Sequence, residues 1–157
     1  MQRIFVFIIL YIVHTSSSAQ SSFLFADFNM SPRIEALGGE INAIIDDDVS
    51  LSQSTPSLLN REMDGMISFS FSDYFIDIRG VSFNFAKYSE ILGMYSIGVK
   101  AINYGDFINR DILGNNLGVF SANDQMITFG IAQELNRSLV LGVNFSFLNS
   151  NYESYHA

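Results

Sequence analysis

The chain has 157 residues, a formal net charge of −8, no cysteine, and only 15% charged residues. This acidic balance argues against nucleic-acid binding, which requires clusters of Lys and Arg, and the lack of Cys excludes disulfides and thiolate metal sites. The chain is too apolar for an ordinary soluble domain, yet beyond residue 19 no apolar run reaches the ~20 residues of a membrane helix. Hydrophobicity spread in this way is typical of a membrane β-barrel, although a soluble β-sandwich can also produce it.

Residues 1–19 are predicted to form a cleaved secretory signal peptide. Arg3 supplies the positive start, Ile4–Val13 the apolar stretch, and Ser17–Ala19 a cleavage site of small residues. The apolar stretch is too short to span a membrane as a helix. We therefore expect export from the cytoplasm without an inner-membrane anchor.

Residues 20–65 lack an alternating pattern and are predicted to form an irregular, plug-like segment. Gly38 and Gly39 interrupt any regular element. Asp48 before VSLSQ is expected to cap a short helix, and Thr55 or Ser57 to cap another. The acidic run Asp46–Asp48 is expected to cap a turn in preference to binding Ca²⁺, because the spacing of an EF-hand loop is absent.

From Met66 the sequence predicts five β-strands, each with bulky apolar residues on one side and small or polar residues on the other. The predicted ranges are 66–72, 77–87, 91–104, 125–135 and 139–152. Residues 66–157 would form the first strands of an antiparallel transmembrane β-barrel. The side chains expected to face lipid are Phe69, Phe71, Phe83, Phe85, Ile97, Val99, Phe129, Ile131, Leu141, Val143, Phe145 and Phe147.

The connections give the predicted strands a direction. Residues 87–91 and 135–139 are short links, whereas residues 104–125 are long and rich in Gly, Asn and Asp. Outer-membrane barrels have short periplasmic turns and longer external loops, so the long link is expected outside the cell.

Aromatic and charged residues are expected near the membrane interfaces. This orientation places Tyr74, Tyr104 and Tyr152 near the outer interface and Tyr88 near the inner one. Arg79 shares its side of the strand with Phe83, and we expect it at the outer rim, where it can reach headgroups.

A soluble β-sandwich is the main alternative fold, because its inner faces alternate in the same way. Its solvent face would carry Lys, Glu, Thr and Arg, where this chain has Ser, Gly, Ala and Asn. The pattern favours the barrel. Because closure requires about eight strands, five predict an incomplete barrel and a chain that is the first part of a longer protein.

The sequence predicts no enzyme, cofactor or metal site. It contains no nucleotide-binding, hydrolase or zinc motif, and beyond the signal segment its single histidine is His156. The carboxylate pairs Asp46/Asp48 and Asp73/Asp77 are expected to be turn or loop residues. Lys100 and Glu134 lie on the small-residue sides of their strands, where we expect them to form salt bridges or meet water.

Residues 33–60 resemble the N-terminal signature of the FadL-like outer-membrane barrels of Bacteroidetes. The resemblance rests on Ala36-Leu37-Gly38-Gly39, Asp47-Asp48-Val49-Ser50 and Thr55-Pro56-Ser57, with Thr55 in place of the usual Asn. Residues 102–105, 117–122 and 150–155 resemble the PorQ-type members of this group, which belong to the type IX (Por) secretion system.

This resemblance implies a non-enzymatic protein of the cell outer membrane, in contact with outer-membrane lipid. Such a protein would aid secretion or surface attachment of cargo by anchoring another type IX component, such as a PorZ-like surface protein. The irregular segment would pack inside or beneath the barrel, and residues 106–124 would contact the partner. The alternative function is a FadL-like channel for hydrophobic small molecules, which the small polar inward faces disfavour.

Overall fold

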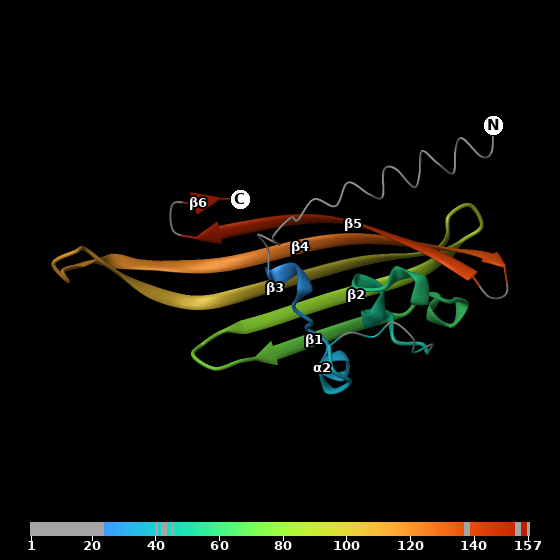
Figure 1. The fold of residues 1–157 in the computed structure, drawn as a ribbon, viewed down its shortest axis with the longest axis horizontal. Helices are drawn as coiled ribbons and strands as arrows, with labels where there is room; N and C mark the ends of the chain where they lie inside the picture. The colour runs from blue at the N-terminus through green and yellow to red at the C-terminus, as the bar shows by residue number, and fades with distance from the viewer. Residues whose placement is uncertain are drawn as a thin grey trace, which may run out of the picture.

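The computed structural model describes residues 24–39, 41, 44, 46–136 and 139–152, and the backbone of 155–156; the predicted signal peptide lies outside these ranges. Its main element is an antiparallel sheet in which strands follow one another in chain order (Figure 1). The strands are β1 (Ile67–Asp73), β2 (Arg79–Ser89), β3 (Gly93–Arg110), β4 (Asn116–Asn136), β5 (Leu139–Tyr152) and the short β6 (Tyr155–His156). The five predicted strands and the all-β class are confirmed. The sheet is open, with β1 at one edge.

The prediction that a long loop joins the third and fourth strands was wrong. β3 continues to Arg110 and β4 begins at Asn116, so most of residues 104–122 form a two-stranded hairpin arm. The hairpin arm projects beyond the other strands (Figure 1). Its turn is organised by Asp111, whose carboxylate accepts hydrogen bonds from the backbone and side chain of Asn115. These bonds lower the pKa of Asp111.

A β-bulge separates the hairpin arm from the rest of the sheet. Asn103 pairs with Asn123, but the next pair is Asp106 with Ser121, so β3 has one extra residue at this level. Gly105 lies within this irregularity with a φ of +84°, a conformation that glycine adopts without steric cost. The extra residue reverses which face of β3 each following side chain occupies.

The small-residue face of the sheet is covered by the described residues between 24 and 65, here called the N-terminal segment. It contains η1 (Leu24–Asp27), α2 (Pro32–Ala36), η2 (Val49–Gln53), η3 (Pro56–Leu58) and η4 (Arg61–Met63). Polar side chains of the sheet are buried beneath it, including Asn84, Ser96 and Thr128. Among the described residues no helix has the length and hydrophobicity needed to cross a membrane.

Glycines on the strands allow this close packing. A β-carbon at position 98 would lie 2.6 Å from the Nε2 atom of Gln53, and one at position 142 would lie 2.8 Å from the Cα atom of Ser57. Such approaches are available only to glycine. Gly98 and Gly142, on the small-residue face, are therefore positions where η2 and η3 contact the sheet.

The N-terminal segment has its own local order. α2 ends at Ala36 and is followed by Gly38 and Gly39, whose N–H groups donate to the carbonyls of Glu35 and Ile34 in a Schellman motif. The Asp48 side chain accepts from the Ser50 N–H at the start of η2, so the predicted cap is confirmed. Thr55 occupies the cap position of η3, but its hydroxyl donates to the Ile41 carbonyl and makes no cap.

The bulky face of the sheet is exposed. Phe69 and Phe147 keep 69% and 71% of their surface accessible, whereas Asn84 on the opposite face keeps 1%. In a soluble sandwich the bulky face would be the buried one. The side chains therefore have an arrangement inverted relative to a soluble β-protein.

Candidate functional site

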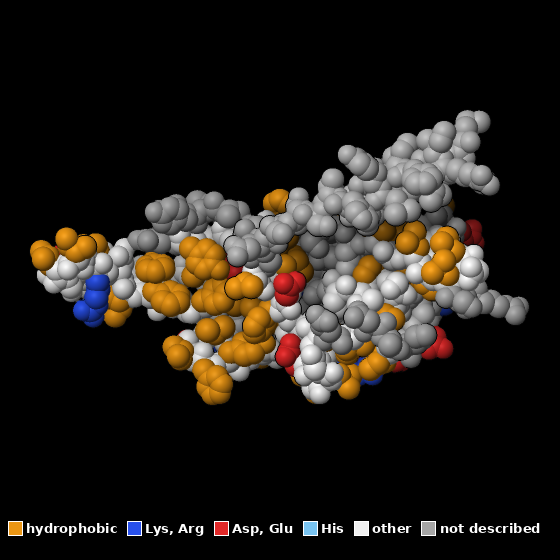
Figure 2. All heavy atoms as spheres, viewed as in Figure 1, with side chains coloured by type: hydrophobic (Ala, Val, Ile, Leu, Met, Phe, Trp, Pro, Cys, Tyr) orange, Lys and Arg blue, Asp and Glu red, His pale blue; other side chains and the backbone are white. Residues whose placement is uncertain are grey.

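An apolar cavity of about 680 Å³ lies on the small-residue face, here called the inner face, between η1 and the parts of β3, β4 and β5 nearest the hairpin arm. Hydrophobic side chains gather here, beside the hairpin arm (Figure 2). It is lined mainly by Phe25, Ile78, Tyr104, Phe107, Phe120 and Tyr152.

The β-bulge creates the aromatic wall of this cavity. Because of the extra residue in β3, Phe107 pairs with Phe120 on the inner face, and their rings stack at 5.4 Å. Without the bulge Phe107 would point outward, as Val99 and Ala101 do. The inner face thus changes from small polar residues beneath the N-terminal segment to aromatic residues beyond it.

A buried carboxylate lies at the wall of the cavity. Tyr104 and Tyr152 stack at 6.1 Å, and both hydroxyls donate to Asp124 Oδ2, at 2.7 and 2.8 Å. Asp124 is 3% exposed, and its Oδ1 has no hydrogen-bond partner among the described residues. Tyr104 and Tyr152 lie at one end of the sheet, and both side chains face its small-residue side.

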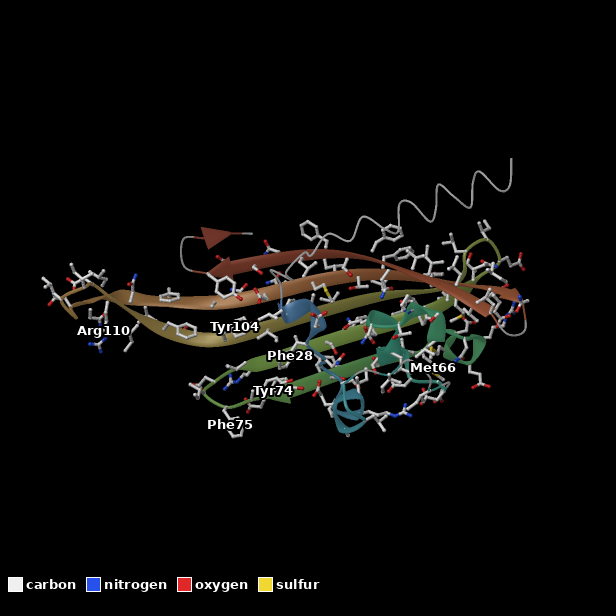
Figure 3. All side chains as sticks on the ribbon, in the orientation of Figure 1. Phe28, Met66, Tyr74, Phe75, Tyr104 and Arg110 are labelled. Atoms are coloured by element: carbon white, nitrogen blue, oxygen red, sulfur yellow. The ribbon has the colours of Figure 1, made fainter. Side chains whose placement is uncertain are left out.

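A second apolar cavity of about 460 Å³ adjoins η1 at the β1–β2 turn. Phe28 of the N-terminal segment meets Tyr74 edge-on at 5.5 Å. Figure 3 shows Phe28, Tyr74 and Tyr104 in one region, with Phe75 at the turn and Met66 at the other end of the sheet. Together the two cavities form an aromatic chamber whose lining suits an apolar ligand.

The residues that carry the resemblance to FadL-like barrels lie away from this chamber. Ala36, Leu37, Gly38 and Gly39 end α2, Asp47 and Asp48 precede η2, and Pro56 begins η3. Their role in the structure is to shape and dock the N-terminal segment.

Asp46 and Asp48 bind Arg33 of α2. The Arg33 guanidinium forms ion pairs with both carboxylates, and the pair with Asp48 measures 3.2 Å. The hydrogen bond from Arg33 lowers the pKa of Asp46. The expectation that this acidic run serves turn and cap structure is confirmed for Asp48. In the described ranges no three His, Cys, Asp or Glu side chains gather as metal ligands.

Lys100 joins the sheet to the N-terminal segment. Its ammonium donates to the carbonyl oxygens of Ala26 and Phe28, at 2.9 and 2.8 Å, and lies 5.0 Å from the Phe25 ring centroid. Its hydrogen-bond partners are thus backbone carbonyls in place of the expected salt bridge, and the side chain is 3% exposed. Glu134 is exposed near the end of β4.

The twelve residues predicted to face lipid all lie on the face opposite the N-terminal segment. Nine are exposed, and Phe85, Phe129 and Ile131 are partly buried by their neighbours. Arg79 shares this face and lies 3.8 Å from its cross-strand partner Asp73. Asp73 at the end of β1 thus faces Arg79 at the start of β2. Asp77 lies in the turn that joins these two strands.

A scan against protein-family models, a search of curated proteins and a search of solved structures found no match to this chain.

Proposed function

We propose that the sheet is part of the wall of an outer-membrane β-barrel, with the N-terminal segment as a plug on its inner face. The observation that carries this proposal is the inversion of the two faces, in which Phe and Ile side chains are exposed and Ser, Asn and Thr side chains are buried. Water disfavours such a surface at about 25 cal/mol per Å² of apolar area, whereas bilayer hydrocarbon accepts it.

The proposal requires that both edges of the sheet find partners. An unpaired edge inside a bilayer leaves backbone N–H and C=O groups without hydrogen bonds, at a cost of several kcal/mol each. β1 lies at one edge, and β5 is joined at the other only by the two residues of β6. Further strands, from this or a neighbouring chain, would supply the missing bonds and close the barrel.

Within this wall we assign the hairpin arm to partner binding. Its exposed apolar side chains, among them Ile108, Ile112, Leu113, Leu117 and Val119, are unusual for a hairpin in water. Such a patch supports binding of a surface protein. Together with the resemblance to PorQ-type proteins, it favours a role in type IX secretion, in which the barrel anchors a PorZ-like component during delivery or attachment of cargo.

Cell fractionation tests the membrane part of the proposal. The protein should be recovered in the outer-membrane fraction and resist extraction by salt or alkaline carbonate. Recovery as a soluble periplasmic monomer would contradict it. For the secretion role, deletion of the gene should release cargo from the cell surface, and the protein should co-purify with a surface component.

The aromatic chamber favours a second function, passage of hydrophobic small molecules. The sequence suggested a polar interior, but beyond the bulge the inner face carries Phe107, Phe120, Tyr104 and Tyr152. A fluorescent apolar probe bound by the purified protein, and lost in Phe120→Asn, would support transport. Intact probe binding together with normal secretion in Phe120→Asn would separate the chamber from the secretion role.

A further inference from the structure

On the exposed face, one row of polar side chains crosses strands β1 to β5. The five residues are register partners in sequence: Asp73 with Arg79, Arg79 with Asn103, Asn103 with Asn123, and Asn123 with Asn151. We name these five residues the polar row. The next row below it is mixed, because Gln125 and Asn149 share it with Phe71, Val81 and Ala101.

Below the mixed row the exposed face is apolar on every strand. One row consists of Phe69, Phe83, Val99, Ile127 and Phe147, and the following row of Ile67, Phe85, Ile97, Phe129 and Phe145. The next contains Lys87 and Tyr95 beside Ile131 and Val143, so charge returns at this level. The apolar rows thus form a band bounded on both sides.

The distance between the two charged levels is near the height of bilayer hydrocarbon. On β2, Arg79 of the polar row and Lys87 beyond the apolar band are separated by about 27 Å along a strand that rises ~3.4 Å per residue. At the ~40° tilt of barrel strands this corresponds to about 21 Å along the membrane normal, close to the ~25 Å band of outer-membrane barrels.

The hairpin arm begins directly beyond the polar row, and its outward residues are again apolar. Ile108 and Val119 are register partners on this face, and both are exposed. They are separated from the apolar band by the polar row and by the pair Asp106 and Ser121. Lipid hydrocarbon cannot reach both apolar zones without also surrounding Arg79 and the amides, which costs ~2–4 kcal/mol for an Arg at the midplane alone.

We infer that the polar row lies within the outer headgroup region of the membrane, which at this tilt it crosses obliquely over about 12 Å of depth, and that the hairpin arm stands in water. The occupant assigned to the row is the polar headgroup of outer-leaflet lipid. Its amides, the Arg79 guanidinium and the Asp73 carboxylate complement the phosphates, hydroxyls and ammonium groups found there. A hollow of about 440 Å³ on this face, lined by Arg79, Asn103, Asn123 and Gln125 together with apolar neighbours, offers room for such a group.

This inference rests on the proposed membrane location and deepens it. It explains why the apolar side chains of the hairpin arm would be available to a protein partner, since lipid does not cover them. It also implies that β3 and β4 leave the bilayer at the bulge, which lies immediately beyond Asn103.

The chain contains no native cysteine, so single cysteines can report depth along β4. An environment-sensitive fluorophore is attached to each of four variants, Val119→Cys, Asn123→Cys, Ile127→Cys and Phe129→Cys. Each labelled protein is reconstituted in phosphatidylcholine liposomes with brominated acyl chains. We expect at least threefold quenching at positions 127 and 129, weak quenching at 123, and none at 119. Phe147→Cys, beside Ile127 on β5, should match position 127.

The outcomes separate this inference from the membrane proposal. Quenching at 119 equal to that at 129 would overturn the headgroup assignment while supporting membrane insertion. No quenching at any position would overturn both. As a second test, Asn123→Leu together with Asn151→Leu should raise quenching of a label at Ser121, and an unchanged signal there would count against the polar row as the boundary.

Discussion

The Lys100 ammonium donates a 2.8 Å hydrogen bond to the carbonyl oxygen of Phe28, across a sequence separation of 72 residues. Together with the bond to Ala26, this contact fixes η1 on the inner face of β3. The position of η1 in turn determines one wall of the aromatic chamber, since Phe25 belongs to η1 and Phe28 comes directly after it.

Replacing Lys100 by Met should loosen the start of the N-terminal segment. The change leaves two carbonyls without their donor, and a buried polar group without a partner costs about 1–3 kcal/mol. We expect faster trypsin cleavage at Arg33, measured by timed digestion in detergent. Lys87→Met, at an exposed position of β2, is the control and should leave cleavage unchanged. Equal protection of both variants would show that these bonds do not hold η1.

Gly142→Ala should disturb docking of η3 more than Gly98→Ala does. At position 142 the new methyl group meets backbone atoms of Pro56 and Ser57, which cannot move without shifting η3. At position 98 it meets the end of the Gln53 side chain, which can rotate away, and the Asn84 side chain. Hydrogen exchange of residues 49–58 should accelerate at least tenfold in the first variant and only slightly in the second. The reverse order would contradict the contact map of this face.

Acid should release Arg33 from its carboxylate partners. Because the hydrogen bond from Arg33 lowers the pKa of Asp46, the pair contributes stability above the ordinary value of about 3.8 and loses it as pH falls through the lowered pKa. Exchange of the α2 amides, corrected for intrinsic rates, should increase between pH 5 and pH 2. Asp46→Asn should show this increase already at pH 7, whereas Asp47→Asn at the exposed neighbouring carboxylate should not.

Ile76→Gly should stabilise the β1–β2 hairpin. Ile76 and Asp77 both have φ near +60°, a region that is unfavourable for a β-branched side chain. Relief of this strain should raise the free energy of unfolding by ~1 kcal/mol, measured by guanidinium denaturation in detergent. The control is Ile112→Gly, a change at another exposed hairpin isoleucine that lacks a positive φ, and it should give no gain. Equal effects in both variants would argue against strain at Ile76.

The strands were predictable because bulky apolar residues recur at every second position. In β5 this period of two runs from Leu139 to Phe147, and both ends of the strand were predicted correctly. The Asp48 cap was also readable, since an acidic residue directly before a short helix has one common local role.

The hairpin arm and the aromatic chamber could not be predicted in the same way. Residues 104–125 contain the Gly, Asn and Asp that usually indicate loops, and the strands persist there because each pairs with the other along the arm. The bulge then changes the face of Phe107, which no periodic pattern reports. The partners of Lys100 were hidden for another reason, because backbone carbonyls leave no trace in the side-chain sequence.

The inverted faces have a practical consequence for any work with this protein in solution. Its covered side is made of hydroxyls and amides, and its bare side displays phenylalanine rings such as Phe69 and Phe147. In plain buffer these rings have only other copies of the chain to bind, so the apparent particle mass should rise with concentration. In a surfactant the same surface takes up a collar of detergent, and the mass measured then depends on the amphiphile as much as on the polypeptide.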